Sequence, residues 1–126
     1  MHGSLTKIGV IVATCDRPFL LSSRSIPSIL NQSVCPDYII IVDDSRDNSN
    51  KSKNESYIQS LQELGVPVTL ICNRRTRGAS GAWNTGIDWV FEQTVAPENT
   101  FIAILDDDDS WNSKYLEKCL KKCKKG

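Results

Sequence analysis

The chain has few of the residues on which several common kinds of catalysis depend. It contains 126 residues but a single histidine, His2, which lies in a polar N-terminal stretch. A histidine-based catalytic triad is therefore not expected. No apolar run approaches the roughly 20 residues of a membrane-spanning helix, and we expect no signal peptide at the start of the chain. We expect one domain, residues 1–126, that is long enough to bury a hydrophobic core.

The charge balance argues against one class of partner. Fifteen lysines and arginines match fifteen aspartates and glutamates, so no overall field favours nucleic acid. The charge is uneven, however, because residues 114–126 contain six lysines and one glutamate. Such a tail is a solvated helix face or, alternatively, a contact with anionic lipid or phosphate. The expected location is cytoplasmic, with a membrane-peripheral position as the alternative.

The five cysteines fit neither a disulfide framework nor a zinc site. Their number is odd, and their spacings match no zinc-binding pattern. Free core thiols in a reducing cytosol are the expected state. The cysteines are Cys15, Cys35, Cys72, Cys119 and Cys123.

Two glycine-rich phosphate-binding signatures are missing as well. No Gly-x-Gly-x-x-Gly follows the first apolar run, and no Gly-Lys-Ser/Thr occurs, which disfavours a dinucleotide-binding fold and a P-loop. Short apolar runs instead alternate with helical patterns. We expect strands at 8–14, 38–42, 66–72 and 101–105, and helices at 19–32, 55–64, 79–91 and 114–122. This order predicts an α/β fold with a Rossmann-like, mostly parallel four-stranded sheet, strand order 3-2-1-4, and helices on both faces.

Two segments are less regular. Pro27 disrupts the first helix, which either starts near Ser25 or is kinked there. The polar stretch 45–54 is rich in Asn and Ser, and we expect it to be a mobile loop.

Acidic residues follow two of the expected strands. Asp43 and Asp44 end the second strand, and the run Asp106–Asp109 ends the fourth. The carboxyl ends of parallel strands meet in one crevice, where open α/β sheets bind ligands. Adjacent carboxylates repel one another unless a cation offsets their charge, and carboxylates plus substrate phosphates suit Mg²⁺ or Mn²⁺. The two clusters predict a site for a nucleotide diphosphate; the alternative is a solvated acidic turn.

With its motifs in this order, the chain resembles the N-terminal, nucleotide-binding half of a family 2 glycosyltransferase with the GT-A fold. Four segments carry the resemblance: Val10–Arg17 (VIVATCDR), Ile41–Ser45 (IVDDS), Gly78–Gly86 (GASGAWNTG) and Leu105–Trp111 (LDDDDSW). The resemblance implies that Ala13, Thr14 and Asp16 lie along the nucleotide and that Asp44 contacts the base.

The same resemblance assigns the remaining binding residues. Gly78, Ser80 and Asn84 line the sugar-nucleotide pocket. Asp106 and Asp108 match the DxD motif, which binds the diphosphate through Mn²⁺ or Mg²⁺. Asp108 is the expected direct metal ligand together with Asp106, and Asp106 or Asp107 faces the ribose.

The implied reaction is inverting transfer of a sugar, expected to be UDP-linked, to an unknown saccharide, lipid or protein acceptor. Relatives continue beyond the helix that follows the DxD motif, so we expect the acceptor-binding half and the general base to lie beyond Gly126. An exposed truncation surface would favour self-association. Two alternatives remain: a non-catalytic nucleotide or nucleotide-sugar binding module, and a metal-dependent phosphatase or phosphotransferase.

Overall fold

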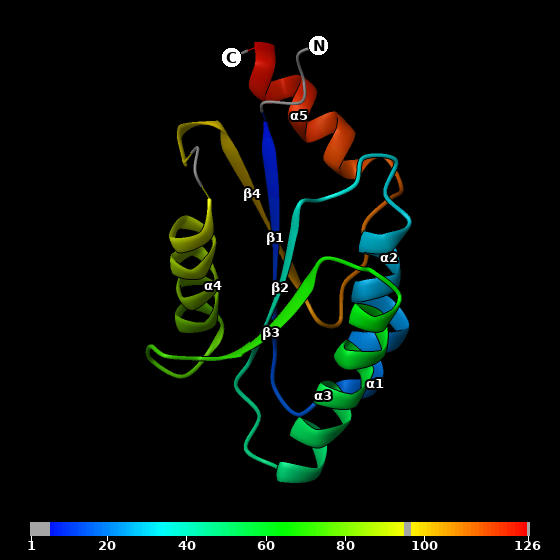
Figure 1. Ribbon diagram of the computed structural model, residues 1–126, viewed down its shortest axis with the longest axis vertical. Coiled ribbons are helices and arrows are strands. Elements are labelled where there is room, and N and C mark those ends of the chain that lie inside the picture. The colour runs from blue at the N-terminus through cyan, green and yellow to red at the C-terminus, as the bar shows by residue number, and fades with distance from the viewer. Residues whose placement is uncertain (1–5, 95–96, 126) are drawn as a thin grey trace.

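Four parallel strands form the centre of the molecule and lie in the order β3-β2-β1-β4 (Figure 1). The computed structural model describes residues 6–94 and 97–125. The strands are β1 (Lys7–Thr14), β2 (Tyr38–Asp43), β3 (Val68–Cys72) and β4 (Thr100–Asp106). All three pairings are parallel, so the predicted sheet direction and strand order are confirmed.

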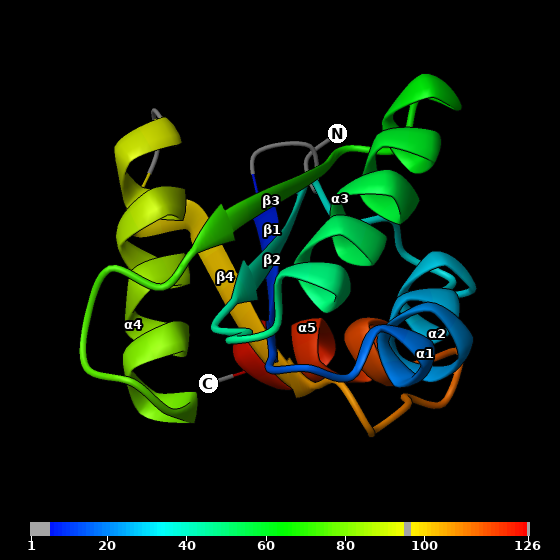
Figure 2. The same ribbon diagram turned by 90° about the horizontal axis from the view of Figure 1, so that it is seen from below.

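Helices cover both faces of the sheet, but unequally. Helix α4 lies alone on one face, and α1, α2, α3 and α5 lie on the other (Figure 2). The helical elements are α1 (Pro18–Leu20), the π-helical turn η2 (Leu21–Ser25), α2 (Ile26–Leu30), α3 (Asn48–Glu63), α4 (Ala79–Gln93), the short 3₁₀ turn η3 (Pro97–Asn99) and α5 (Tyr115–Lys125). None of the helices in the described ranges is long and apolar enough to cross a membrane.

Strand β1 is buried on both of its faces. Val10 and Val12 pack against the face that carries α2, α3 and α5, whereas Ile11 packs against α4. All three are fully buried. A central parallel strand covered on both sides needs such a continuous apolar run, and this explains why no polar residue interrupts residues 8–13.

The first helix passes through Pro27 and does not begin at Ser25. Helical backbone extends from Pro18 to Leu30, with a π-helical turn at Leu21–Ser25. Proline has no N–H to donate to the preceding turn, so a regular α-helical hydrogen bond is missing at Pro27. The wider π turn just before it is a common way to accommodate a local break in the α-helical ladder.

The expectation of a mobile loop at 45–54 is wrong, because α3 already begins at Asn48. The carboxylate of Asp47 accepts hydrogen bonds from the backbone N–H groups of Ser49 (2.8 Å) and Asn50 (3.2 Å), which caps the helix. Asn54 is buried on the inner face and donates to Asp43 Oδ2 at 3.0 Å. The Asn- and Ser-rich composition reflects these capping and buried polar contacts.

The expectation of core thiols is also wrong for three cysteines. Cys15, Cys35 and Cys72 are exposed, and Cys119 is half-buried on α5. Cys15 directly follows β1 and Cys72 is the last residue of β3, so each lies where its strand leaves the sheet. The side chain of Cys123 lies outside the described part.

Glycine at position 81 allows α4 to start close to the preceding loop. A Cβ atom at Gly81 would overlap the backbone carbonyl oxygen of Thr76, and this backbone atom cannot move as a side chain can. We predict that Gly81→Ala lowers the stability by about 1–3 kcal/mol. Thermal unfolding followed by circular dichroism should show a lower Tm than in Ser80→Ala, a matched change at the exposed neighbour. Equal melting temperatures would contradict this account.

Candidate functional site

A cleft of about 670 Å³ lies at the carboxyl ends of the strands. The ends of β1, β2 and β4 and the first turn of α4 form its walls, so Asp44 from one acidic cluster and Asp106, Asp107 and Asp108 from the other meet there. The lining residues are Ala13, Thr14, Cys15, Asp16, Arg17, Asp44, Arg46, Arg77, Gly78, Ala79, Ala82, Asp106, Asp107 and Asp108.

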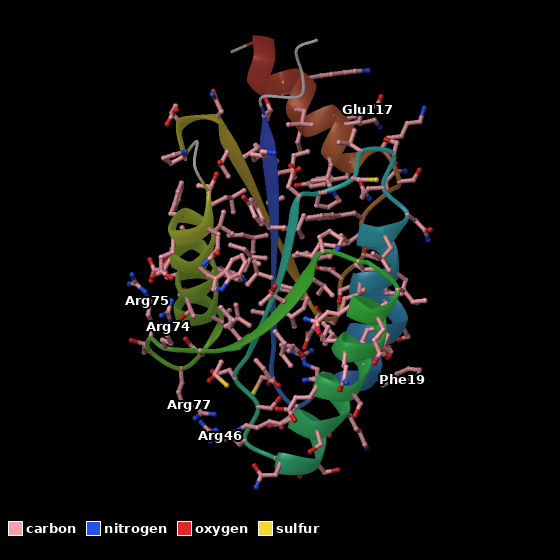
Figure 3. The ribbon with its side chains drawn as sticks, in the orientation of Figure 1. Phe19, Arg46, Arg74, Arg75, Arg77 and Glu117 are labelled. Atoms are coloured by element: carbon pink, nitrogen blue, oxygen red, sulfur yellow. The ribbon has the colours of Figure 1, made fainter. Side chains whose placement is uncertain are left out.

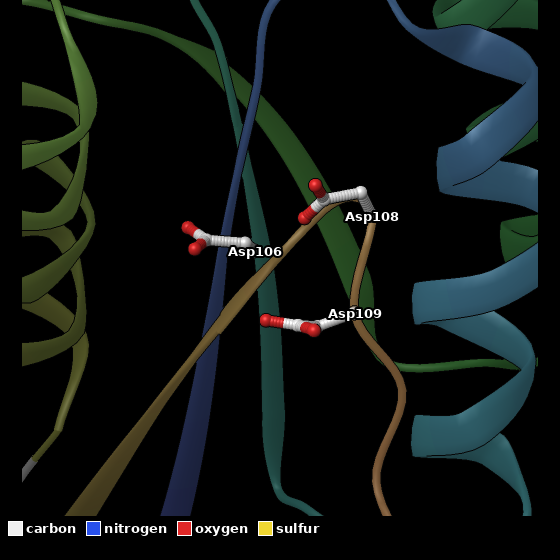
Figure 4. Close-up of side chains that lie close together, drawn as sticks. All are labelled: Asp106, Asp108 and Asp109. Atoms are coloured by element: carbon white, nitrogen blue, oxygen red, sulfur yellow. The ribbon is translucent and has the colours of Figure 1, made fainter.

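Three carboxylates converge at the end of β4 (Figure 4). Carboxylate oxygens of Asp106, Asp108 and Asp109 all lie within 4.8 Å of one another, and all three residues are exposed. The chain turns here, with the N–H of Asp109 donating to the carbonyl of Asp106 at 3.1 Å. The turn thus brings Asp109 back beside Asp106, although sequence reasoning did not select it. Three hard oxygen donors at this spacing fit a divalent cation such as Mg²⁺ or Mn²⁺.

Asp107 behaves differently from its three neighbours. It is 2% exposed, and its Oδ2 accepts a hydrogen bond from Thr14 Oγ1 at 2.9 Å. Burial raises the pKa of Asp107, while the Thr14 hydrogen bond and the charge of Arg17 oppose this shift. The Asp107 carboxylate therefore joins the end of β1 to the end of β4.

Arg17 supplies positive charge to the acidic end of the cleft. Its Nε lies 3.6 Å from Asp107 Oδ1, and its Nη1 lies 3.4 Å from Asp108 Oδ2. The guanidinium thus offsets part of the repulsion between adjacent carboxylates. Sequence reasoning missed Arg17, although its position directly after the first strand was a usable signal.

Asp44 connects the end of β2 to the start of α4. Its Oδ2 accepts a hydrogen bond from the backbone N–H of Gly78 at 2.9 Å, and its carbonyl accepts one from Arg77 Nη2 at 2.9 Å. Gly78 has φ = 111°, a backbone conformation that side chains other than hydrogen rarely allow. Glycine is therefore required where the β3–α4 loop approaches Asp44 and the helix begins.

Asp16 organises the loop between β2 and α3. It is a non-glycine residue with φ = 55°, and its own N–H donates to Ser45 Oγ at 2.7 Å. Its carboxylate accepts from the backbone N–H groups of Asp47 (3.1 Å) and Arg46 (3.2 Å) and from Asn50 Nδ2 (3.3 Å). The Asp47 and Arg46 hydrogen bonds hold the pKa of Asp16 below its ordinary value.

The structure brings most of the predicted site residues together, with two exceptions. Ser80 and Asn84 are exposed on α4 and are not among the residues that line the cleft. The cleft instead contains three arginines that were not selected: Arg17, Arg46 and Arg77. Each is brought to the cleft by a loop that follows a strand, at a position that helical and strand periodicity do not reveal.

The molecule is an α/β protein with a cleft at the carboxyl ends of its strands and carboxylates that fit a divalent ion. Comparison with known proteins identifies the family to which the chain belongs. The chain belongs to glycosyl transferase family 2, whose sequence model matches residues 10–126.

Curated relatives agree with this assignment. An uncharacterized glycosyltransferase of Methanocaldococcus jannaschii is 32% identical over 123 residues, which cover 96% of this chain and 39% of that protein. The Escherichia coli UDP-Glc:alpha-D-GlcNAc-diphosphoundecaprenol beta-1,3-glucosyltransferase WfgD is 30% identical over 95 residues, covering 75% of this chain and 32% of that protein. The chain thus spans less than two fifths of the length of either relative.

Solved structures share the fold. A mannosyltransferase from Pyrobaculum calidifontis in complex with GDP-Man and Mn²⁺ superposes with a TM-score of 0.68 at 21% identity, over 91% of this chain and 31% of that one. S. aureus TarS 1–349 in complex with UDP-GlcNAc superposes with a TM-score of 0.66 at 18% identity, over 95% and 32%. These neighbours are GT-A glycosyltransferases, so the predicted fold class is confirmed.

The buried contact between Thr14 and Asp107 generates a stability prediction. We expect Thr14→Val, which keeps the shape but removes the donor, to lower the free energy of unfolding by about 1–3 kcal/mol. The buried carboxylate would lose its hydrogen bond without becoming accessible to water. Urea unfolding measures the change. Thr69→Val on β3 is the control, because the Thr69 hydroxyl has no hydrogen-bond partner in the described part. Equal losses in both variants would argue against a special role for this contact.

Proposed function

We propose that the protein takes part in transfer of a sugar from a UDP-linked donor to an acceptor hydroxyl, with inversion at the sugar carbon. The observation that carries this proposal is that acidic residues at the ends of two strands, β2 and β4, lie in one cleft. Asp106, Asp108 and Asp109 converge on one side, and Asp44 lies with Gly78 on the other. A nucleotide diphosphate has a charged diphosphate, which matches the side with the three carboxylates, and a hydrogen-bonding nucleoside, which matches the side with Asp44.

The acidic side is where we place the diphosphate. Asp106 and Asp108 are the residues that would hold Mn²⁺ or Mg²⁺, with Asp109 within reach as a third ligand. The chemistry of such an ion is to offset the negative charge that develops on the leaving diphosphate. Arg17, beside Asp108, adds a fixed positive charge to the same region.

The nucleotide itself is proposed to extend from there toward Asp44. Ala13 and Thr14 at the end of β1 form the floor between the two sides. Complexes of structural neighbours support this class of donor, since they contain GDP-Man with Mn²⁺ in one case and UDP-GlcNAc in another. The name of the E. coli relative specifies UDP-Glc.

None of the four consecutive aspartates is assigned as the general base. Asp106, Asp108 and Asp109 are committed to the proposed cation, and a base that shared a metal would lose its affinity for a proton. Asp107 is buried, and its carboxylate is already engaged by Thr14 and Arg17. The acceptor and its base are therefore proposed to lie outside this cluster.

The metal dependence of nucleotide binding tests this function. We expect Asp108→Ala to weaken UDP binding in the presence of Mn²⁺ by on the order of tenfold or more, because a metal ligand is lost. Isothermal titration calorimetry with Mn²⁺ and with EDTA measures the effect.

Glu63→Ala provides a matched control, since Glu63 is an exposed carboxylate on α3 that does not line the cleft. It should bind UDP as the wild type does. Equal UDP affinity with and without Mn²⁺, in the wild type and in Asp108→Ala alike, would refute the proposed metal-assisted site.

A further inference from the structure

The loops after β2 and β3 bring two arginines to the cleft, beside Asp44. Arg46 and Arg77 both line the cleft, and both side chains project from loops at the strand ends (Figure 3). Arg77 is anchored, because it donates to the carbonyl of Asp44 at 2.9 Å and lies 3.7 Å from its carboxylate. Arg46 is exposed, and its guanidinium has no hydrogen-bond or ion-pair partner in the described ranges. It is thus a planar cation available to a ligand.

Arg46 and Arg77 line the same part of the cleft as Cys15 and Asp44. Burial, Asp16 and Asp44 raise the pKa of the Cys15 thiol, and the charges of Arg77 and Arg46 partly oppose this. Cys15 also donates to the Asp44 carbonyl at 3.4 Å. Arg46 therefore lines the cleft near Cys15, whose thiol contacts Asp44, the residue proposed to contact the base.

No aromatic side chain occurs among the described residues that line the cleft. The described residues that line it are aliphatic, acidic or basic, apart from Thr14 and Cys15. A nucleobase is flat and apolar on its faces, and proteins cover such a face with an aromatic ring or with the plane of an arginine guanidinium. Among the described residues that line the cleft, only the arginines offer a flat cationic group of this kind. Arg77 is held by Asp44, and Arg17 by Asp107 and Asp108, which leaves Arg46.

Asp16 determines where Arg46 lies. Its carboxylate holds the backbone N–H groups of Arg46 and Asp47, and Ser45 accepts the N–H of Asp16 in return. These contacts join the end of β1 to the loop that carries Arg46. The left-handed backbone of Asp16 is needed for its carboxylate to reach this loop.

We propose that Arg46 is a specificity-determining residue that stacks on the nucleobase of the donor, and that Asp16 is the positioning residue that holds Arg46 over the cleft. This inference rests on the proposed function, since it requires a nucleotide whose diphosphate occupies the carboxylate side. It assigns to Asp16 a role through Arg46, where the sequence predicted a direct contact with the nucleotide.

Stacking on a base requires a planar side chain, whereas charge attraction requires only a positive charge. Lysine keeps the charge but has no plane, whereas tyrosine has a plane but no charge. Base stacking contributes enough that alanine substitution should weaken binding about tenfold. Loss of stacking should not affect a ligand that has no base.

The test therefore compares two ligands by calorimetry in Mn²⁺: UDP, and pyrophosphate as the same charged group without a base. We expect Arg46→Ala and Arg46→Lys to lose about tenfold in UDP affinity and to bind pyrophosphate within twofold of wild type. Arg46→Tyr should recover most of the UDP affinity. Arg24→Ala, which removes an exposed arginine outside the cleft, should leave both affinities unchanged.

Asp16 is tested by a double-mutant cycle. Asp16→Ala should weaken UDP binding as Arg46→Ala does, and the double variant should show little further loss, because both changes remove one interaction. Asp16→Asn, which keeps one acceptor oxygen, should lie between Asp16→Ala and wild type. Equal, independent losses that multiply in the double variant would overturn the positioning role.

The outcomes also separate this inference from the proposed function. Pyrophosphate and UDP weakened alike by Arg46→Ala would show a phosphate contact, and UDP affinity unchanged in that variant would show no contact; either overturns the stacking proposal and leaves the donor site intact. Wild-type protein that binds neither ligand with Mn²⁺ would overturn both. Thermal melts confirm that each variant is folded.

Discussion

The site depends on one buried interaction, the hydrogen bond from Thr14 to Asp107. It joins the last residue of β1 to the first residue after β4, at the place where both strands leave the sheet. An unpaired carboxylate in this position would be costly, so the hydrogen bond and Arg17 are conditions for burying it. With Asp107 held inward, its neighbours Asp106 and Asp108 are directed into the cleft. The geometry of the acidic cluster thus follows from the packing of a carboxylate that takes no part in it.

The loops of the cleft are tied to one another in a similar way. Asp16 binds the loop after β2, and Asp44 binds the loop before α4 through Gly78. Each tie uses a carboxylate from one strand end and a backbone N–H from the next loop. Every substitution except proline keeps the backbone N–H donor, so the loops can keep their relative positions while their exposed side chains, Arg46 among them, remain available for recognition.

The strands, their order and the shared cleft could be predicted because they depend on apolar periodicity and on parallel βα connection rules. The first turns of α3 could not, since their polarity hid a cap by Asp47 and a buried amide at Asn54. The exposure of Cys15 was missed because an apolar run does not reveal the residue at which its strand leaves the sheet. Arg46 has no local signal at all: its position depends on Asp16, 30 residues earlier in the chain.

The division of the four aspartates into buried and exposed residues could have been predicted from the alternating pattern of the fourth strand. Along β4 and into the following turn, Ala103, Leu105 and Asp107 are buried while Ile104, Asp106 and Asp108 are exposed. Alternation is the side-chain period of a strand, and two residues apart means the same face. The burial pattern continues this alternation from β4 into the turn that follows it, so Asp106 and Asp108 are exposed and the residue between them is buried. An aspartate is tolerated there because Thr14 and Arg17 contact it, which explains how a run of four carboxylates divides into one buried group and three exposed ones.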